Sequence, residues 1–378
     1  MNARPGGAPA SAGAPPHAAP QGAAPFDGAA EAYDAAFSDR RLGLLLRGLL
    51  HEELGRHLPA SGLHLECGCG TGLDALWMLR RGAAVVATDV SPAMRAATIA
   101  RLRAAVGREG AAALTPRDAG EPLDVASRGG APLAVPDAHG EGDVASDDAP
   151  GQRASPRRHA AAGVAAVADL DLAGAPMHRR RQLVGAAAVA HLDLADPAPP
   201  TRPEYSTHDD PRLRPLSSGI PFDGVFDGCF SSFGPLNCVL DRRPLAAALQ
   251  RWLRPGARVC FVVMPRLAPW DWLWYGAHLR PSAALRRLRR APVAGLPGGG
   301  RLRLDYPSAR DLDAELGPSF RRLDHRAIGA LLPISEAAGL VSRAPLLFEA
   351  VATLEREVAA RWPWPHLCDH ALHVWERR

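Results

Sequence analysis

A glycine-rich turn between two apolar stretches holds the residues best suited to chemistry. Residues 63–89 read LHLECGCGTGLDALWMLRRGAAVVATD. Gly68, Gly70 and Gly72 let the backbone turn sharply and approach a ligand closely. A helix is expected over residues 73–81, and its first turn offers backbone amides with no partner inside the helix. The spacing therefore predicts a ligand-binding loop at the carboxyl end of a strand.

Two carboxylates beside this loop narrow the choice of ligand. Glu66 precedes the first glycine, and Asp89 ends the next predicted strand. An acid at the end of the second strand, where Asp89 lies, can accept hydrogen bonds from both ribose hydroxyls of an adenosine. A carboxylate at Glu66 would repel a pyrophosphate but attract the ammonium group of a methionine. Because the glycines also depart from the G-x-G-x-x-G spacing of dinucleotide sites, S-adenosylmethionine is favoured over a nicotinamide cofactor.

The stretch resembles the first motif of class I S-adenosylmethionine-dependent methyltransferases, E-x-G-x-G-x-G. Residues 89–94 (DVSPAM) resemble the D-x-S-x-x-M of the branch related to ubiquinone and menaquinone methyltransferases. Residues 253–256 (LRPG) resemble that branch's L-x-P-G-G turn, although Ala257 replaces the second glycine. Its F-D and A-x-x-Y-D segments are matched at 222–223 and 30–34. The resemblance covers roughly residues 26–106 and 221–264, and it implies methyl transfer from S-adenosylmethionine.

The resemblance also implies a role for each matching residue. Glu66 would lie near the amino group of the cofactor, Asp89 would bind the ribose, and Val90 and Met94 would flank the adenine. An acid after the third strand would reach the adenine amine, and either Asp193 or Asp171 could supply it, with Asp193 favoured. The expected cofactor-binding residues are Glu66, Gly68, Cys69, Gly70, Gly72, Asp89, Val90, Met94, Asp193, Ser231 and Tyr33.

Two later segments are candidates for the acceptor site. Residues 231–237 (SSFGPLN) follow the predicted fourth strand, where ligands of open α/β sheets lie. We expect Phe233 there, and Asn237 either orients an acceptor oxygen or caps the next turn. Residues 269–275 (PWDWLWY) could form a lid over an apolar acceptor, in which Trp270 and Trp274 line the pocket and Asp271 orients a hydroxyl. Alternatively, the segment forms an ordinary buried helix face. No catalytic base can be assigned, because His278, His325 and His370 are each expected to be surface or packing residues.

The remaining pattern indicates the elements that position these residues. Helices are expected at 42–58, 93–106, 241–253, 308–316 (capped by Ser308) and 350–361. Strands are expected at 63–65, 83–88, 222–230, 257–264 and 301–306, with 370–376 as an edge strand. Strands that alternate with helices predict an α/β fold, a doubly wound and mostly parallel sheet with helices on both faces.

Composition divides the chain further. Residues 1–25 are expected to be a disordered tail and residues 26–378 a methyltransferase domain, interrupted by a low-complexity insertion at 107–219 and by the lid at 265–300. The insertion repeats itself, since GVAAVADLDLA at 163–173 recurs as GAAAVAHLDLA at 185–195. One copy could supply a core strand. A protein that keeps the fold without catalysis, as a cofactor-binding or partner protein, is the alternative function.

Charge and cysteine content limit the partners. The chain has no lysine and a formal net charge of +4 at pH 7, and its densest basic stretch, 286–290, is interpreted as a solvated helix face. We therefore expect a small-molecule acceptor and no nucleic acid. The six cysteines contain no pair of C-x-x-C units, which indicates reduced thiols, a cytoplasmic location and no metal. No apolar run approaches the roughly 20 residues of a transmembrane helix.

Overall fold

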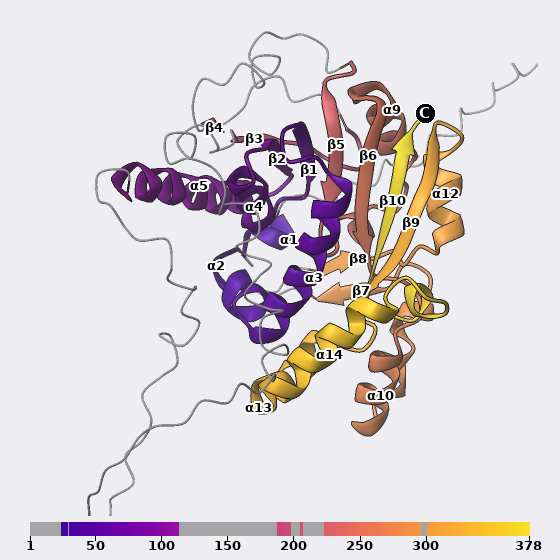
Figure 1. The fold of residues 1–378 in the computed structure, drawn as a ribbon. Coiled ribbons are helices and arrows are strands. Elements are labelled where there is room, and N and C mark those ends of the chain that lie inside the picture. Colours follow the sequence, from indigo (N-terminus) through magenta and orange to yellow (C-terminus); the bar gives the residue numbers. More distant parts are fainter. Residues whose placement is uncertain (1–23, 29, 113–186, 198–204, 207–222, 296–300) are drawn as a thin grey trace, which may run out of the picture. The chain divides into compact units, whose positions relative to one another are not determined.

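The computed structural model describes residues 24–28, 30–112, 187–197, 205–206, 223–295 and 301–378 (Figure 1). Residues 1–108 and 183–378 form one compact unit, and residues 109–182 form a second, of which only four residues are described. Residues 1–23 of the tail expected at 1–25 and most of the insertion expected at 107–219 therefore lie outside the described residues, whereas residues 24–25 belong to a short helix. The sheet and nearly all of the helices that cover it belong to the first unit.

An eight-stranded sheet forms the centre of this unit, in the order β4-β3-β2-β1-β5-β6-β10-β9. Strands β3, β2, β1, β5 and β6 run parallel, whereas β4, β10 and β9 run antiparallel to their neighbours. The strands are β1 (Leu63–Cys67), β2 (Ala84–Asp89), β3 (Ala187–His191), β4 (Tyr205–Ser206), β5 (Phe226–Ser231), β6 (Leu253–Val263), β9 (Phe320–Ile328) and β10 (His370–Arg377). This arrangement confirms the predicted doubly wound, mostly parallel α/β fold.

Helices cover both faces of the sheet (Figure 1). On one face, α9 (Arg243–Trp252) and α12 (Ala309–Leu316) bury leucines against β1, β5 and β6. On the other, α3 (Arg41–His57), α4 (Leu73–Arg80), α5 (Pro92–Ala112), α13 (Ala338–Arg343) and α14 (Pro345–Val358) pack on β2, β6 and β10. The shorter elements are α1 (Ala24–Asp27), α2 (Ala30–Tyr33), α10 (Pro269–Ala277), α11 (Pro281–Ala284) and the two-stranded sheet β7 (Val293–Gly295) with β8 (Arg301–Arg303).

The predicted repeat does supply a core strand. Strand β3 falls in the second copy, 185–195, and pairs in parallel with β2 from Val85 to Asp89. The edge of β2 that does not face β1 is open to pairing, so even a short apolar segment such as β3 can extend the sheet there. The first copy, which contains Asp171, lies outside the described residues.

Some predicted elements were placed wrongly. The stretch 370–376 was expected at the edge of the sheet, but β10 lies between β6 and β9, and β9 was not predicted. The alternation was misleading because the polar positions are buried too, with His373 stacked on His325 and on Trp375. The turn expected at 255–256 instead lies within β6, opposite an irregularity in its pairing with β5. By contrast, Ser308 caps α12 in a capping box with Asp311, as predicted.

No helix among the described residues is by itself long and apolar enough to span a membrane. One bent pair, Ser335–Arg343 with Pro345–Val358, passes the same test of length and composition, with a bend of 119° between its halves.

The stacked histidines make the stability of the sheet depend on pH. The ring centroids of His325 and His373 are 4.2 Å apart. Burial and the positive charge of Arg322 lower the pKa of His325 from 6.5 to about 4, and burial lowers the pKa of His373 well below its usual value. Below about pH 6.5 the unfolded chain therefore binds more protons than the folded chain, so acidification favours unfolding.

We expect the free energy of unfolding to fall by about 2 kcal/mol between about pH 7 and pH 4.5 through His325 alone, and His373 should add to this fall. Urea titrations at a series of pH values measure this slope. The variant His325→Gln removes one titrating ring and should flatten it. An identical slope in the variant would show that the pair does not control the pH dependence.

Candidate functional site

The glycine loop lies where β1 ends and α4 begins. The amides of Gly68 and Cys69 both donate to the carbonyl of Thr88, 2.8 Å away, which ties the loop to the end of β2. Gly68 has φ +75°, and a Cβ there would lie 2.4 Å from the ring of Pro235. Gly72 has φ +80°, and a Cβ there would lie 2.7 Å from Thr98 Cγ2. Only glycine therefore fits these two positions without a shift of the backbone.

A cavity of about 850 Å³ opens beside this loop, at the carboxyl ends of the parallel strands. Its walls come from the loop, from the segments after β2, β3, β5 and β6, and from α3. Nine of the residues predicted from the sequence line it: Tyr33, Gly68, Cys69, Gly70, Asp89, Val90, Met94, Asp193 and Phe233. The structure thus gathers in one place residues that are spread over about 200 positions of the chain.

Asp89 is held in place by the backbone around it. Its Oδ2 accepts a hydrogen bond from the amide of Gly70 and its Oδ1 accepts one from the amide of Ser91, each at 2.9 Å. Burial raises the pKa of Asp89, whereas these two amide bonds oppose the rise. Each carboxylate oxygen has a second lone pair. The carboxylate can therefore accept two further hydrogen bonds from a ligand in the cavity.

Asp193 lies two residues beyond β3 and is half-buried. Its Oδ1 accepts a hydrogen bond from the amide of Ala195 at 2.8 Å, which fixes the turn after the strand. Leu192 and Leu194 on either side of it also line the cavity. Apolar walls beside one carboxylate suit a flat heterocycle with an amino group.

An ion-pair cluster that was not predicted forms another part of the wall. Arg47 on α3 and Asp74 in the first turn of α4 both line the cavity and pair with each other. His51, one turn beyond Arg47, also contacts the Asp74 carboxylate at 2.7 Å. Burial raises the pKa of Asp74, but the charges and hydrogen bonds of Arg47 and His51 outweigh burial and hold it well below its usual range. The guanidinium of Arg47 lies 5.2 Å from the ring centre of Phe233.

Three residues predicted to bind the cofactor do not line the cavity. Gly72 lies at the start of α4, and the hydroxyl of Ser231 donates to the carbonyl of Cys67 at 2.7 Å inside the sheet. Glu66 is 1% exposed, and its Oε2 has no partner among the described residues. Burial, reinforced by the negative charge of Asp74, raises the pKa of Glu66 well above its usual value, although Arg47 opposes the rise.

Asn237 has a structural task. Its Nδ2 donates to the carbonyls of Met264, at 3.0 Å, and of Asp305, at 2.7 Å, and its Oδ1 accepts from the amide of Met264 at 2.9 Å. The side chain is fully buried and lies outside the cavity wall. These bonds use its whole amide group to join the end of β6 to the chain after β8. Neither the acceptor contact nor the simple turn cap expected from the sequence describes this arrangement.

The aromatic segment 269–275 also lies outside the cavity wall. Trp270 and Trp274 pack with Tyr275 against Ile334 and Ala337 in a separate apolar cluster. Asp271 is 1% exposed and pairs with Arg287, at 2.8 Å, and with Arg286, at 3.2 Å. A hydroxyl of a substrate therefore has no access to Asp271 in this arrangement.

The basic stretch 286–290 is consequently not a uniformly solvated helix face. Arg287 is 4% exposed and pairs with Asp369 as well as Asp271. A sequence pattern cannot reveal such a pair, because Asp369 lies 82 positions away. Of the arginines in this stretch, only Arg289 and Arg290 are exposed, and they lie beyond the short helical turn at 286–288.

The apolar part of the cavity wall is built from residues that the sequence did not single out. Met264 follows β6, and Leu302 and Leu304 come from β8 and the residue after it. Cys238 also lines the cavity, and burial raises the pKa of its thiol to about 12. The thiol therefore stays protonated at neutral pH and is a poor base or nucleophile.

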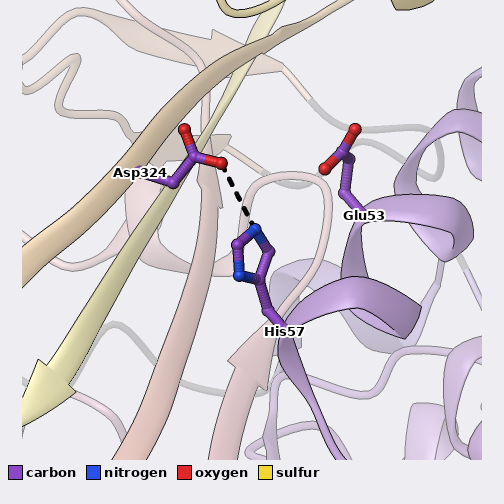
Figure 2. A group of neighbouring side chains, drawn as sticks. All are labelled: Glu53, His57 and Asp324. Atoms are coloured by element: carbon purple, nitrogen blue, oxygen red, sulfur yellow. Dashed lines mark ion pairs between the residues drawn. The ribbon is translucent and has the colours of Figure 1, made fainter.

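A second group of titratable side chains lies between α3 and β9, and Figure 2 shows His57 pointing toward Asp324 with Glu53 nearby. Ligand atoms of the three residues lie within 4.8 Å of one another. The guanidinium of Arg326 contacts both carboxylates, and Arg56 pairs with Glu53. Because two positive charges already compensate the two acids, we interpret this cluster as an ion-pair network that joins α3 to β9.

Comparison with known proteins gives a family match for part of the chain. Residues 65–119 match a family model described as a methyltransferase domain. Similar solved structures include a methyltransferase dependent on S-adenosylmethionine from Mesorhizobium loti, with 13% identity, coverage of 89% of this chain and 98% of that chain, and a TM-score of 0.38. Another, from Methanosarcina mazei, has 12% identity, coverage of 86% and 96%, and a TM-score of 0.40. With scores this low, neither likeness supports a conclusion about function. No curated protein matches the chain.

The matched domain contains the glycine loop, Asp89 and Met94, and these are the residues that the cavity brings together. The matched domain, the fold and the site together support a methyltransferase that uses S-adenosylmethionine as its cofactor.

Proposed function

We propose that this enzyme transfers the methyl group of S-adenosylmethionine to a small, mostly apolar or aromatic acceptor by in-line displacement. The observation that carries the proposal is the cavity itself, because one continuous space has polar walls near Asp89 and Arg47 and apolar walls near Leu302 and Leu304. The resemblance to quinone methyltransferases in residues 89–94 supports an acceptor of the same kind, with a flat apolar ring.

The nucleoside part of the cofactor fits the walls after β2 and β3. Asp89 would accept the two ribose hydroxyls with the lone pairs that Gly70 and Ser91 leave free. Val90 and Met94 would pack on the adenine, and Asp193 would accept from its amino group. This set of groups matches an adenosine, which needs one acid for its diol and one for its amine.

The methionine part fits the walls formed by α3 and the glycine loop. Arg47 would attract its carboxylate, and Tyr33 would cover that end of the cavity. The unpartnered Oε2 of Glu66 offers an acceptor for the ammonium group. Since Glu66 lies behind the loop and not in the cavity wall, we propose that it acts through a water molecule.

The cofactor supplies an activated methyl group, and the protein contributes alignment and exclusion of water. Phe233 follows β5 and lines the cavity, and it packs edge-on against Phe37 and His370. Its φ of 49° is rare for a residue with a side chain, so the surrounding packing holds the ring in a fixed place. We propose that this ring borders the path between the methyl group and the acceptor.

The acceptor end of the site is tested by Leu304→Ala, which shortens one apolar wall. We expect the Michaelis constant for the acceptor to rise about tenfold while the affinity for S-adenosylhomocysteine stays the same. The assay uses labelled S-adenosylmethionine with phenolic or quinol acceptors, compared with sugar acceptors. The matched control is Leu44→Ala, an exposed leucine on α3 that does not line the cavity. Preference for the sugars, or equal effects of both variants, would count against an apolar acceptor.

A further inference from the structure

The segment 266–303 has an unusual distribution of charge. It contains eight arginines and one acid, Asp271, which is buried and paired with Arg286 and Arg287. The exposed charges of this segment, where the structure describes it, are therefore all positive. They are Arg266, Arg280, Arg289, Arg290, Arg301 and Arg303. Within the described part of the chain, Arg280, Arg289 and Arg290 form no ion pair.

Helix α10 (Figure 1, lower right) lies in this segment and carries exposed apolar side chains. Its inner side buries Asp271 and Tyr275. Its outer side carries Trp272, 38% exposed, and Leu273, 64% exposed, followed one turn later by Gly276 and Ala277. All nine residues of the helix are described, and none on this outer side is charged. The chain then exposes Leu285 and Leu288, each by about half of its surface.

Leu279, just after α10, is strained as well as exposed. Its amide donates to Gly276 and that of Arg280 donates to Tyr275, a helix ending that usually places glycine at this position. Leu279 adopts φ +53° there, a conformation that is unfavourable for a leucine, and its side chain is 89% exposed. These two hydrogen bonds hold the conformation, but the exposed side chain itself gains nothing from burial. A partner that buries this side chain would compensate the strain.

We propose that these residues form a docking surface for an anionic lipid bilayer, consisting of Trp272, Leu273, Leu279, Leu285 and Leu288 with Arg280, Arg289 and Arg290. Tryptophan and leucine enter the boundary between headgroups and acyl chains, while arginines contact lipid phosphates. A nucleic acid would use the arginines but leave the leucines in water. The proposal goes beyond methyl transfer and does not depend on the identity of the acceptor.

The same segment of the chain also reaches the wall of the cavity. Leu302 on β8 lines the cavity, whereas its neighbours Arg301 and Arg303 are exposed. Successive residues of a strand point to opposite sides. A bilayer contacted by these two arginines would therefore lie next to the apolar wall of the site.

The first test is flotation of the full chain with vesicles. We expect binding to vesicles of phosphatidylglycerol at low salt, weaker binding as salt is raised, and little binding to vesicles of phosphatidylcholine. Absence of binding to phosphatidylglycerol would overturn the proposal. Duplex DNA at the same salt concentrations tests the other polyanion. Tighter binding to DNA than to the vesicles, unchanged when the exposed leucines are replaced, would also overturn the proposal.

The decisive variant is Leu279→Gly. Glycine relieves the strained backbone, so the melting temperature should stay the same or rise, yet affinity for phosphatidylglycerol vesicles should fall about tenfold because an apolar side chain is lost. The double variant Arg289→Gln with Arg290→Gln should lower it about fivefold for each charge removed. Leu44→Ser removes an exposed leucine from α3 and should change nothing. Equal loss in Leu44→Ser, or full binding in Leu279→Gly, would contradict the proposal.

Discussion

Replacing Asp89 with alanine is expected to weaken the binding of S-adenosylhomocysteine about a hundredfold or more. The wild-type carboxylate is fixed by the amides of Gly70 and Ser91, each at 2.9 Å, and lines the cavity. The variant loses two charge-assisted hydrogen bonds to the ribose, each worth roughly 1.5–3 kcal/mol. Isothermal titration calorimetry measures the dissociation constants of wild type and variant.

Two controls separate loss of the ligand contact from damage to the loop. Asp89→Asn keeps an oxygen for one backbone amide but removes the charge, so its affinity should lie between those of wild type and Asp89→Ala. Asp193→Ala should give a smaller loss, because Asp193 is only half-buried and offers the adenine one contact. NAD should bind none of the proteins. Wild-type affinity for S-adenosylhomocysteine in a folded Asp89→Ala variant would show that Asp89 does not bind the cofactor.

The cofactor loop could be predicted because all its determinants are close in sequence. A strand end, three glycines and a helix start lie within residues 63–81, and the structure reproduces each of them. Asp89 was predictable for the same reason, since β2 pairs directly with β1 and its end must lie beside the loop. Local spacing thus sufficed for residues that lie at the ends of neighbouring strands.

The opposite holds for contacts between distant segments. Arg47 and Asp74 lie on different helices, and an arginine in a leucine-rich helix gives no sign of which acid it will meet. The sequence offers one indication of this cluster: the spacing of Arg47 and His51 places two basic side chains on the same side of α3. Asn237 gave no signal, because the carbonyls that it bonds belong to other segments of the chain.

In the aromatic segment 269–275 a helix is the correct element, but its aromatic side does not face the cavity as expected. A helix at 269–277 was compatible with the pattern, but periodicity does not tell which neighbour a face will meet. Trp270 and Trp274 are one turn apart and therefore share a side, and that side packs on Ile334 and Ala337 instead of the cavity. The buried ion pair of Asp271 and Arg287 fixes the orientation of the helix. Rotation of the helix would expose Asp271 and leave Arg287 buried without this partner.

Replacing Arg287 with alanine should therefore strongly destabilise the protein. Its guanidinium pairs with Asp271 at 2.8 Å and with Asp369, and it donates to the Asp369 carbonyl at 2.9 Å. Burial raises the pKa of Asp369, but His370 and Arg287 outweigh burial and hold it well below its usual range. Removing Arg287 deprives two buried carboxylates of a buried counter-charge, which costs about 3–5 kcal/mol. Urea unfolding measures the free energy.

Arg289 provides the matched control, since it lies two residues away, is exposed and forms no ion pair with any described residue. Arg289→Ala should change the free energy of unfolding by less than about 0.5 kcal/mol. A double variant, Arg287→Met with Asp271→Leu, replaces the ion pair by apolar side chains and should recover part of the loss, because one unpaired carboxylate is removed with its partner. If Arg287→Ala and Arg289→Ala were equally mild, the pair would contribute nothing to the orientation of α10, and the apolar cluster around Trp270 and Trp274 would have to fix that orientation alone.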